Sequence, residues 1–267
     1  MIRRHGRQRL RHRSWRALRE RRRRGIFLLP ALLTTANLFC GFFAMVLTTR
    51  QRYTEAALAL FVAMVMDMLD GRVARLMKAT SQFGVEFDSL ADVVSFGVAP
   101  AFMLYAFALS TLGRAAWFGA FLFVVCGALR LARFNVITGA SDRRWFVGLP
   151  IPAAAAVVAS AVILLQDEEL TRPLRTALAV GTYCVALLMV STFRYWSFKE
   201  IDFARRRPVQ TLLVLVLTAM LVATKHDVFL FLVFAGYALS GPVVWVLRGR
   251  QLAPAHAPAE APGKEQP

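Results

Sequence analysis

Residues 25–49 read GIFLLPALLTTANLFCGFFAMVLTT, and none of these 25 positions carries a charged side chain. A helix rises about 1.5 Å per residue, so this stretch is long enough to cross the roughly 30 Å hydrocarbon core of a bilayer. The hydrophobic core of a signal peptide is shorter, at about 7–15 residues, and ends at a small-residue cleavage site. We see no such site, and we therefore predict a membrane-spanning helix.

Similar apolar stretches follow along the rest of the chain. They cover residues 56–66, 93–113, 115–129, 145–166, 176–193, 208–224 and 228–247. Backbone polar groups in lipid must be satisfied within the segment, which favours helices. The composition agrees, because 57% of the residues are hydrophobic and only 18% are charged. We predict an all-α integral membrane protein with about eight transmembrane helices.

Positive charge is concentrated at the beginning of the chain. The formal net charge is +17, and residues 1–24 hold twelve arginines and a single acid, Glu20. We interpret residues 1–24 as a cytoplasmic segment attracted to anionic lipid head groups. A solvated tail without a role and a nucleic-acid tether are the alternatives. Residues 25–250 form the predicted transmembrane catalytic domain, and the Ala- and Pro-rich residues 251–267 a disordered tail.

The basic residues of the short loops predict the orientation in the membrane. With the N-terminus in the cytoplasm, most of the loop arginines and lysines fall on the cytoplasmic side. Cytoplasmic loops are enriched in these residues. We therefore expect both termini on the cytoplasmic side of the cell inner membrane.

Four aspartates interrupt the apolar pattern. Asp67 and Asp70 lie in the stretch MDMLDGRVAR at 66–75, and Asp88 and Asp92 lie near the start of the next span. A charged group inside a membrane helix costs about 2.5–3.5 kcal/mol on insertion scales. Residues three or four apart share a helix face, so each pair points in one direction. We predict that the two helices bring four carboxylates to one point.

Carboxylates packed this closely cannot all ionise without a counter-charge. An oxygen-only ligand set suits Mg²⁺ or Mn²⁺, and two ions bridged by aspartates suit phosphoryl chemistry. Gly71 and Ala74 leave space beside the acids, and Arg75 lies at the edge of the same face, where it can meet an anion. A metal-ion or proton transporter is the alternative, because transporters also bury carboxylates.

The pattern Asp67-x2-Asp70-Gly71-x2-Ala74-Arg75-x8-Gly84-x3-Asp88-x3-Asp92 places eight fixed positions within 26 residues. It resembles the signature of the CDP-alcohol phosphatidyltransferase family. The resemblance implies a six-helix core, to which this chain would add two helices, and a two-metal site at the cytoplasmic face. It also implies a CDP-linked lipid as donor, CMP as leaving group, and a homodimer.

Carried over by position, the resemblance assigns the four acids. Asp67, Asp70 and Asp88 would be metal ligands. Asp92 would be a metal ligand and also the base that takes a proton from the acceptor hydroxyl.

The resemblance also assigns the small and basic residues of the motif. Gly71, Ala74 and Arg75 would contact the cytidine diphosphate, and Gly84 would keep the two helices close. Thr34 and Asn37 are polar positions in the first apolar span. They would either line the nucleotide pocket or make interhelical hydrogen bonds.

Further stretches resemble the members of this family that use serine. They are residues 29–41, 95–100, 128–135, 148–154 and 194–199. The resemblance implies CDP-diacylglycerol and L-serine as substrates; glycerol phosphate or inositol phosphate as acceptor is the alternative. We expect anionic membrane lipid, and no nucleic acid, as a further partner.

A serine acceptor needs a cation for its carboxylate. The candidate acceptor- or phosphate-binding residues are Arg130, Arg133, Asn135, Ser95, Arg194 and Lys199. For the basic residues, the alternative is the general enrichment of cytoplasmic loops in positive charge.

Overall fold

The computed structural model describes residues 29–77, 81–137, 145–196 and 208–247. The Arg-rich segment 1–24, Lys199 and the tail 251–267 lie outside the described residues, so the predictions made for them stay predictions. The side chain of Arg194 is also outside the described part.

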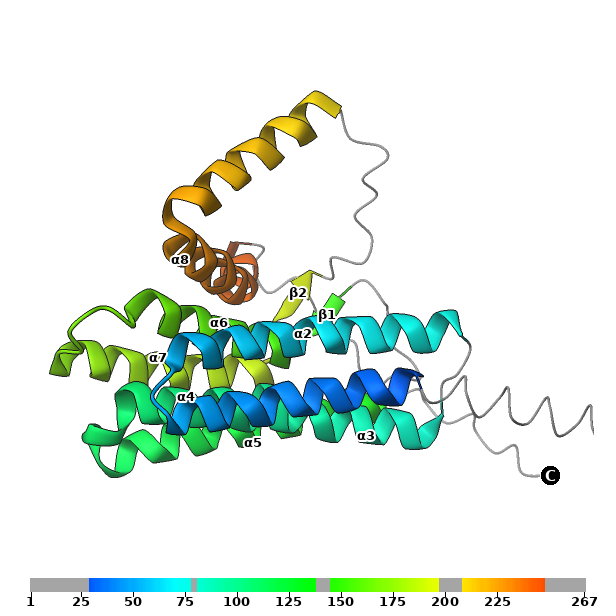
Figure 1. Cartoon of the computed structure of the whole chain (residues 1–267), viewed down its shortest axis with the longest axis horizontal. Helices are drawn as coiled ribbons and strands as arrows, with labels where there is room; N and C mark the ends of the chain where they lie inside the picture. The colour runs from blue at the N-terminus through cyan, green and yellow to red at the C-terminus, as the bar shows by residue number, and fades with distance from the viewer. Residues whose placement is uncertain (1–28, 78–80, 138–144, 197–207, 248–267) are drawn as a thin grey trace, which may run out of the picture.

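Helices make up nearly all of the described chain (Figure 1). The first helix covers Leu29–Thr49. The others are α2 (Tyr53–Leu76), α3 (Gln82–Asp92), α4 (Ala99–Leu104), α5 (Arg114–Ile137), α6 (Ile151–Leu165), α7 (Arg172–Val190) and α8 (Pro208–Leu247). Between α3 and α5 the chain stays helical through the π-helical segments η1 (Val93–Val98) and η2 (Tyr105–Leu109) and the 3-10 turn η3 (Ser110–Leu112).

The predicted class, an all-α membrane protein, is confirmed. Five helices of the described chain are long and apolar enough to cross a membrane, namely Leu29–Thr49, Gln82–Leu112, Arg114–Val136, Arg172–Val190 and Lys225–Leu247. The apolar helix α6 is shorter. The two stretches predicted at 208–224 and 228–247 form two helical parts of α8, separated by a kink at Lys225, where φ is −148° and ψ is 64°. The count of eight spans stays a prediction.

The apolar stretch predicted as a helix from residue 145 begins differently. Residues Trp145–Val147 form strand β1, which pairs antiparallel with strand β2 (Arg194–Trp196), and helix α6 starts only at Ile151. The reason lies at Gly148, which has a φ of +78° and would place a Cβ 2.3 Å from the carbonyl oxygen of Met189. Pro150 follows just before the helix. Only the apolar character of this stretch, and not its conformation, was visible in the sequence.

Strand β2 is attached to the last helix by Tyr195. This side chain is fully buried, and its hydroxyl donates a hydrogen bond to the carbonyl oxygen of Ala238 at 2.9 Å. A Cβ on Gly241 would lie 2.5 Å from the Tyr195 ring. Burial, with a smaller contribution from Tyr237, raises the pKa of Tyr195 to about 12. The phenol therefore stays protonated and able to donate.

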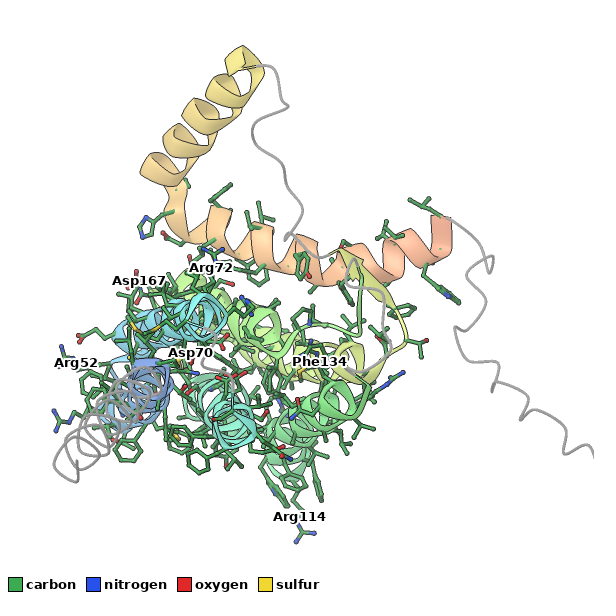
Figure 2. The ribbon with its side chains drawn as sticks, turned by 90° about the vertical axis from the view of Figure 1, so that its right-hand side faces the viewer. Arg52, Asp70, Arg72, Arg114, Phe134 and Asp167 are labelled. Atoms are coloured by element: carbon green, nitrogen blue, oxygen red, sulfur yellow. The ribbon has the colours of Figure 1, made fainter. Side chains whose placement is uncertain are left out.

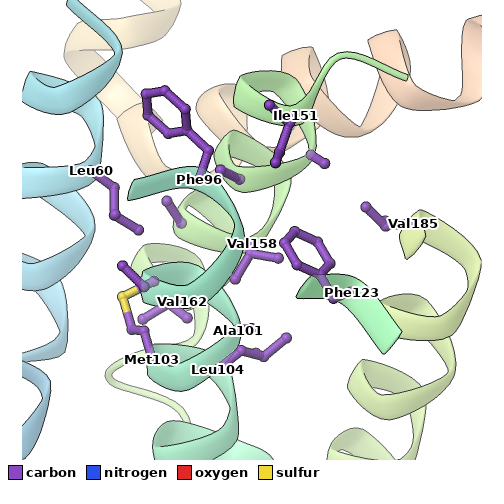
Figure 3. Close-up of a cluster of buried hydrophobic side chains, with 14 of the residues drawn as sticks. Leu60, Phe96, Ala101, Met103, Leu104, Phe123, Ile151, Val158, Val162 and Val185 are labelled. Carbon is purple, nitrogen blue, oxygen red and sulfur yellow. The ribbon is translucent and has the colours of Figure 1, made fainter. Parts of the chain in front are cut away.

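The core lies between the helices, where α2, α4, α5 and α6 meet. Large buried side chains there include Leu60, Phe96, Met103, Phe123 and Ile151 (Figure 3). The outer faces are also apolar, and bulky residues such as Phe39, Phe42, Phe121 and Leu187 are more than half exposed. A helix bundle that is apolar both inside and outside is suited to lipid.

Candidate active site

The four aspartates lie at one end of the bundle. Asp67 and Asp70 are in the C-terminal part of α2, and Asp88 and Asp92 are in α3. Figure 1 shows the end of α2 and helix α3 at the same end of the molecule, and Figure 2 places Asp70 among the helices. Helical periodicity in α2 and α3 therefore directs the acids toward a common region.

Three of the four acids form a compact cluster. Carboxylate oxygens of Asp67, Asp70 and Asp88 lie within 4.8 Å of one another. Asp70 is 4% exposed, whereas Asp67 and Asp88 are partly exposed. Asp70 is therefore the most buried of the three, and Asp67 and Asp88 are partly accessible.

Asp92 lies one helical turn after Asp88 in α3 and is more buried than Asp88. Its exposure is 9%, and its Oδ1 accepts a hydrogen bond from Nδ2 of Asn37 at 3.1 Å. It interacts electrostatically with Asp67, Asp88 and Asp70. Asp92 therefore belongs to the same charged group, although it differs from the others in its hydrogen-bond partner.

The first helix supplies hydrogen-bond donors to aspartates on both α2 and α3. Thr34 Oγ1 lies 3.0 Å from Asp70 Oδ2 and 3.2 Å from the carbonyl oxygen of Pro30, and it can donate to either. Asn37, which is three residues further along, donates to Asp92. Both side chains are buried. The structure shows the interhelical hydrogen bonds of Thr34 and Asn37. Their predicted place in the nucleotide pocket stays a prediction.

Ser95 lies next to this group. It is fully buried, and its Oγ donates to the carbonyl oxygen of Asn37 at 3.1 Å. Its predicted contact with the acceptor or with phosphate stays a prediction.

The small residues of the motif lie beside the acids and the basic end of α2. A Cβ on Gly71 would lie 3.5 Å from Nη1 of Arg75, so the guanidinium folds back over the glycine. Arg75 is exposed and interacts electrostatically with Asp70. Ala74 is half-buried. Gly71 and Ala74 therefore form a short surface with small side chains, and the guanidinium of Arg75 lies at its end, next to the carboxylates.

Gly84 is in the first turn of α3. Its backbone N–H donates to Oγ of the N-cap residue Ser81 at 3.0 Å. Apart from its chain neighbours and its own helix backbone, the only described atom within 4 Å of a Cβ built on Gly84 is that same Oγ, at 3.1 Å. The predicted role of Gly84 in bringing two helices together stays a prediction.

The C-terminal end of α5 brings two of the candidate acceptor-binding residues to this region. Asn135 Nδ2 donates to Oγ of Ser89, the neighbour of Asp88, at 2.9 Å. Arg130 is half-buried and interacts electrostatically with Asp92 and with Tyr237 of α8. Its Nε is buried and has no hydrogen-bond partner among the described residues. Arg133, by contrast, is exposed.

Two further residues beside the site were not predicted. Ser89 lies in α3 between the two acidic positions, and Tyr237 lies in α8, far along the chain from the motif. The position of Ser89 next to Asp88 was a signal that could have found it. Tyr237 is an isolated tyrosine in an apolar span, which carries no such signal.

The carboxylate cluster fits a divalent cation. Its ligand atoms are hard oxygens, which Mg²⁺ and Mn²⁺ prefer. Three carboxylates within 4.8 Å need a counter-charge, and Thr34 contributes only a neutral donor. The cluster can therefore hold metal.

Comparison with known proteins identifies the family. The family model described as CDP-alcohol phosphatidyltransferase matches residues 27–189, a segment that contains all four aspartates. The chain belongs to the CDP-alcohol phosphatidyltransferase family. The resemblance seen in the sequence motif is thereby confirmed.

Several curated relatives share one name. A CDP-diacylglycerol–serine O-phosphatidyltransferase of Helicobacter pylori strain J99 is 37% identical over 222 residues, which cover 83% of this chain and 92% of the relative. A Bacillus subtilis protein of the same name is 37% identical over 64% of this chain and 92% of its own length. An archaetidylserine synthase of Methanothermobacter thermautotrophicus is 37% identical over 62% of this chain and 69% of the relative.

Proposed function

We propose that this protein transfers the phosphatidyl group of CDP-diacylglycerol to the hydroxyl of L-serine and releases CMP. The observation that carries the proposal is the carboxylate cluster of α2 and α3, which lies within the segment matched by the family model. The names of the relatives support serine as the acceptor. The family's chemistry supports a CDP-linked lipid as the donor.

Asp67, Asp70, Asp88 and Asp92 would hold two divalent ions, Mg²⁺ or Mn²⁺. When bound, such ions supply positive charge that offsets the negative charge of the donor's diphosphate. The protein's own contribution is to keep the carboxylates in place, and Thr34 and Asn37 support it through their bonds to Asp70 and Asp92.

Asp92 is the proposed general base. It accepts the proton of the serine hydroxyl, and the hydroxyl oxygen then attacks the β-phosphorus of the donor. The bond from this phosphorus to the bridging oxygen breaks, and CMP leaves with that oxygen. The buried position of Asp92, at 9% exposure, supports this role because it limits access of water to the base.

The nucleotide would bind along the C-terminal part of α2. Gly71 and Ala74 have almost no side chain, so the cytidine diphosphate can approach the backbone there. Arg75 would neutralise phosphate charge, which is supported by its position beside Gly71 and Asp70.

Arg130 is the proposed partner of the serine carboxylate. A half-buried guanidinium with an unpaired Nε, close to Asp92, is suited to bind a carboxylate near the base. Asn135 and Arg133 would complete the acceptor or phosphate site, together with Arg194 and Lys199.

The proposed arrangement in the membrane follows from the substrates. The acyl chains of the donor would stay in lipid while serine enters from the cytosol, so the site would lie at the cytoplasmic face of the inner membrane. Both termini would be cytoplasmic, and the N-terminal arginines would contact anionic lipid. We also propose a homodimer.

The test is to give the purified protein CDP-diacylglycerol with Mn²⁺ or Mg²⁺ and a panel of alcohols, and to follow CMP release. We expect release with serine. Release with glycerol phosphate or inositol phosphate but not with serine would contradict the proposed acceptor. Ion flux in liposomes without CDP-diacylglycerol, and no CMP release with any alcohol, would favour a transporter instead.

A further inference from the structure

Two sequence stretches, residues 37–41 of the first helix and the segment η1 that follows Asp92, meet beside the proposed base. We propose that Asn37 and Ser95 are positioning residues that hold the Asp92 carboxyl group in one orientation, and that Gly41 lets their helices approach closely enough. This inference rests on the proposed function, because it takes Asp92 as the group that receives the acceptor's proton.

Asn37 is bonded through both its side chain and its main chain. Its Nδ2 donates to Asp92 Oδ1 at 3.1 Å, and its carbonyl oxygen accepts from Ser95 Oγ at 3.1 Å. Asn37 and Ser95 are both completely buried. Because Ser95 lies three residues after Asp92, the first helix contacts this part of the chain at the carboxyl group and again one turn later.

The side-chain amide of Asn37 directs its donor, Nδ2, to Asp92 and leaves its acceptor, Oδ1, without a partner among the described residues. Asn37 Oδ1 is buried and has no hydrogen-bond partner among the described residues. An unpaired buried polar atom is unfavourable, so an amide that served packing alone would gain by pairing both of its ends. The observed orientation places a donor on one oxygen of Asp92 and so fixes the orientation of the carboxyl group.

Gly41 explains how Ser95 reaches the backbone of Asn37. Gly41 is one helical turn after Asn37 on the same face. A Cβ at this position would lie 2.4 Å from Ser95 Oγ and 2.6 Å from Ser95 Cα. Any larger side chain would therefore push η1 away from the first helix and break the bond between Ser95 and Asn37.

The chain changes conformation directly after Asp92. Asp92 is the last residue of α3, and the π-helical segment Val93–Val98 begins at the next position. Such segments are uncommon and are found frequently at functional sites. A π turn contains an extra residue, so the side chains after Asp92 are rotated relative to a continuing α-helix. The hydroxyl of Ser95 fixes this rotated turn to the first helix.

The test is a double-mutant cycle on Asn37→Ala and Ser95→Ala. We expect Ser95→Ala to lower kcat about 10-fold and Asn37→Ala about 100-fold, because a misplaced catalytic group loses rate rather than binding. The KM values for serine and CDP-diacylglycerol should change less than twofold. Since Ser95 acts through Asn37, the double variant should be no slower than Asn37→Ala alone.

Two matched variants serve as controls. Ser160→Ala removes a buried serine hydroxyl, and Thr48→Ala removes a buried threonine hydroxyl. In the described part of the chain, the first bonds within α6 and the second within the first helix. Both should keep the kcat of the wild type. They separate the loss of the contact to Asp92 from the general effect of deleting a buried hydroxyl.

Three results would overturn the inference. They are an unchanged kcat for Ser95→Ala, effects that multiply in the double variant, and a raised KM for serine at unchanged kcat. The last result would mean that Ser95 binds the acceptor directly. If another alcohol proves to be the acceptor, the same cycle is measured with that alcohol.

Amide hydrogen exchange tests the contact of Ser95 with the first helix without depending on catalytic activity. In lipid nanodiscs, amides of the segment 93–98 should exchange faster in Ser95→Ala than in the wild type, and Ser160→Ala should leave them unchanged. If the wild type transfers phosphatidyl to no alcohol, the proposed function fails, while this measurement still decides whether the contact exists. Unchanged exchange in Ser95→Ala would overturn the inference on its own.

Discussion

Asp92 differs from the other three aspartates in its surroundings. It accepts a hydrogen bond from the amide of Asn37, whereas Asp67, Asp70 and Asp88 share a compact group of oxygens. This difference supports a separate role for Asp92 as base.

We predict that Asp92→Asn lowers kcat by at least about 1,000-fold, because the amide cannot accept the proton and is a poor metal ligand. The measurement is CMP release with serine, together with a melting curve in detergent to show that the fold is kept. Asp167→Asn changes an exposed acid outside the cluster and should retain full activity. Turnover by Asp92→Asn at the wild-type rate would remove Asp92 as the base.

Thr34→Val tests the support of Asp70 by the first helix. Valine has nearly the same shape but cannot donate to Asp70 Oδ2, so the carboxylate loses one of its orienting bonds. Loss of an outer partner of a metal ligand typically weakens metal affinity by about 10–100-fold. We expect the Mn²⁺ concentration for half-maximal activity to rise within this range. An unchanged Mn²⁺ dependence would show that this bond is not needed.

Strand β2 is bonded to α8 through Tyr195, and this contact lies outside the segment matched by the family model. Gly241 is in close contact with the Tyr195 ring, whereas a Cβ on Gly236, in the same helix, would have no described atom within 4 Å. This contrast provides a matched pair of variants.

Gly241→Ala should therefore lower the free energy of unfolding by about 1–3 kcal/mol through overpacking against Tyr195. Gly236→Ala should be neutral or slightly stabilising, since alanine favours the helix. Thermal unfolding in detergent compares the two. Equal melting temperatures for both variants would show that α8 does not depend on this contact.

Because the Tyr195 phenol is buried, we predict that the free energy of unfolding depends on pH at high pH. Its pKa is raised from 10.0 to about 12 by burial, so the folded protein keeps the phenol protonated where the unfolded chain has lost the proton. The stabilisation is complete below pH 10 and is lost as the pH rises toward about 12. The melting temperature should fall over this interval, and less steeply in Tyr195→Phe. Equal slopes would contradict the prediction.

Several elements could be predicted from the sequence because their signal is local. The absence of charge over 25–49 predicts a membrane helix, and the spacing of Asp67 and Asp70 places both acids on one face of α2. The start of α6 could not be predicted, because Gly148 adopts its positive φ in contact with the Met189 carbonyl, a residue about 40 positions away. The π turn after Asp92 likewise has no local signature.

The hydrogen-bond partners within the site also could not be predicted from the sequence. Thr34 and Asn37 were recognised as unusual polar residues, but their pairing with Asp70 and Asp92 depends on how the first helix is rotated against α2 and α3. The same holds for the bond between Asn135 and Ser89. These contacts join residues that are 36 to 55 positions apart.

The molecule as a whole is an apolar helix bundle with a cluster of carboxylates at one end. The helices are apolar on their outer faces, and the carboxylates meet at the end of α2 and α3. A lipid substrate with a charged head group requires both features together. We propose that this acidic end uses divalent cations to transfer a phosphatidyl group.

The most direct test is the dependence of product formation on metal. CDP-diacylglycerol and serine are given to the purified protein, and both CMP and phosphatidylserine are measured before and after chelation with EDTA. We expect equal amounts of the two products, their loss on chelation, and their return when Mn²⁺ or Mg²⁺ is added in excess. Phosphatidylserine that forms at an undiminished rate in EDTA, or CMP released without phosphatidylserine, would contradict it.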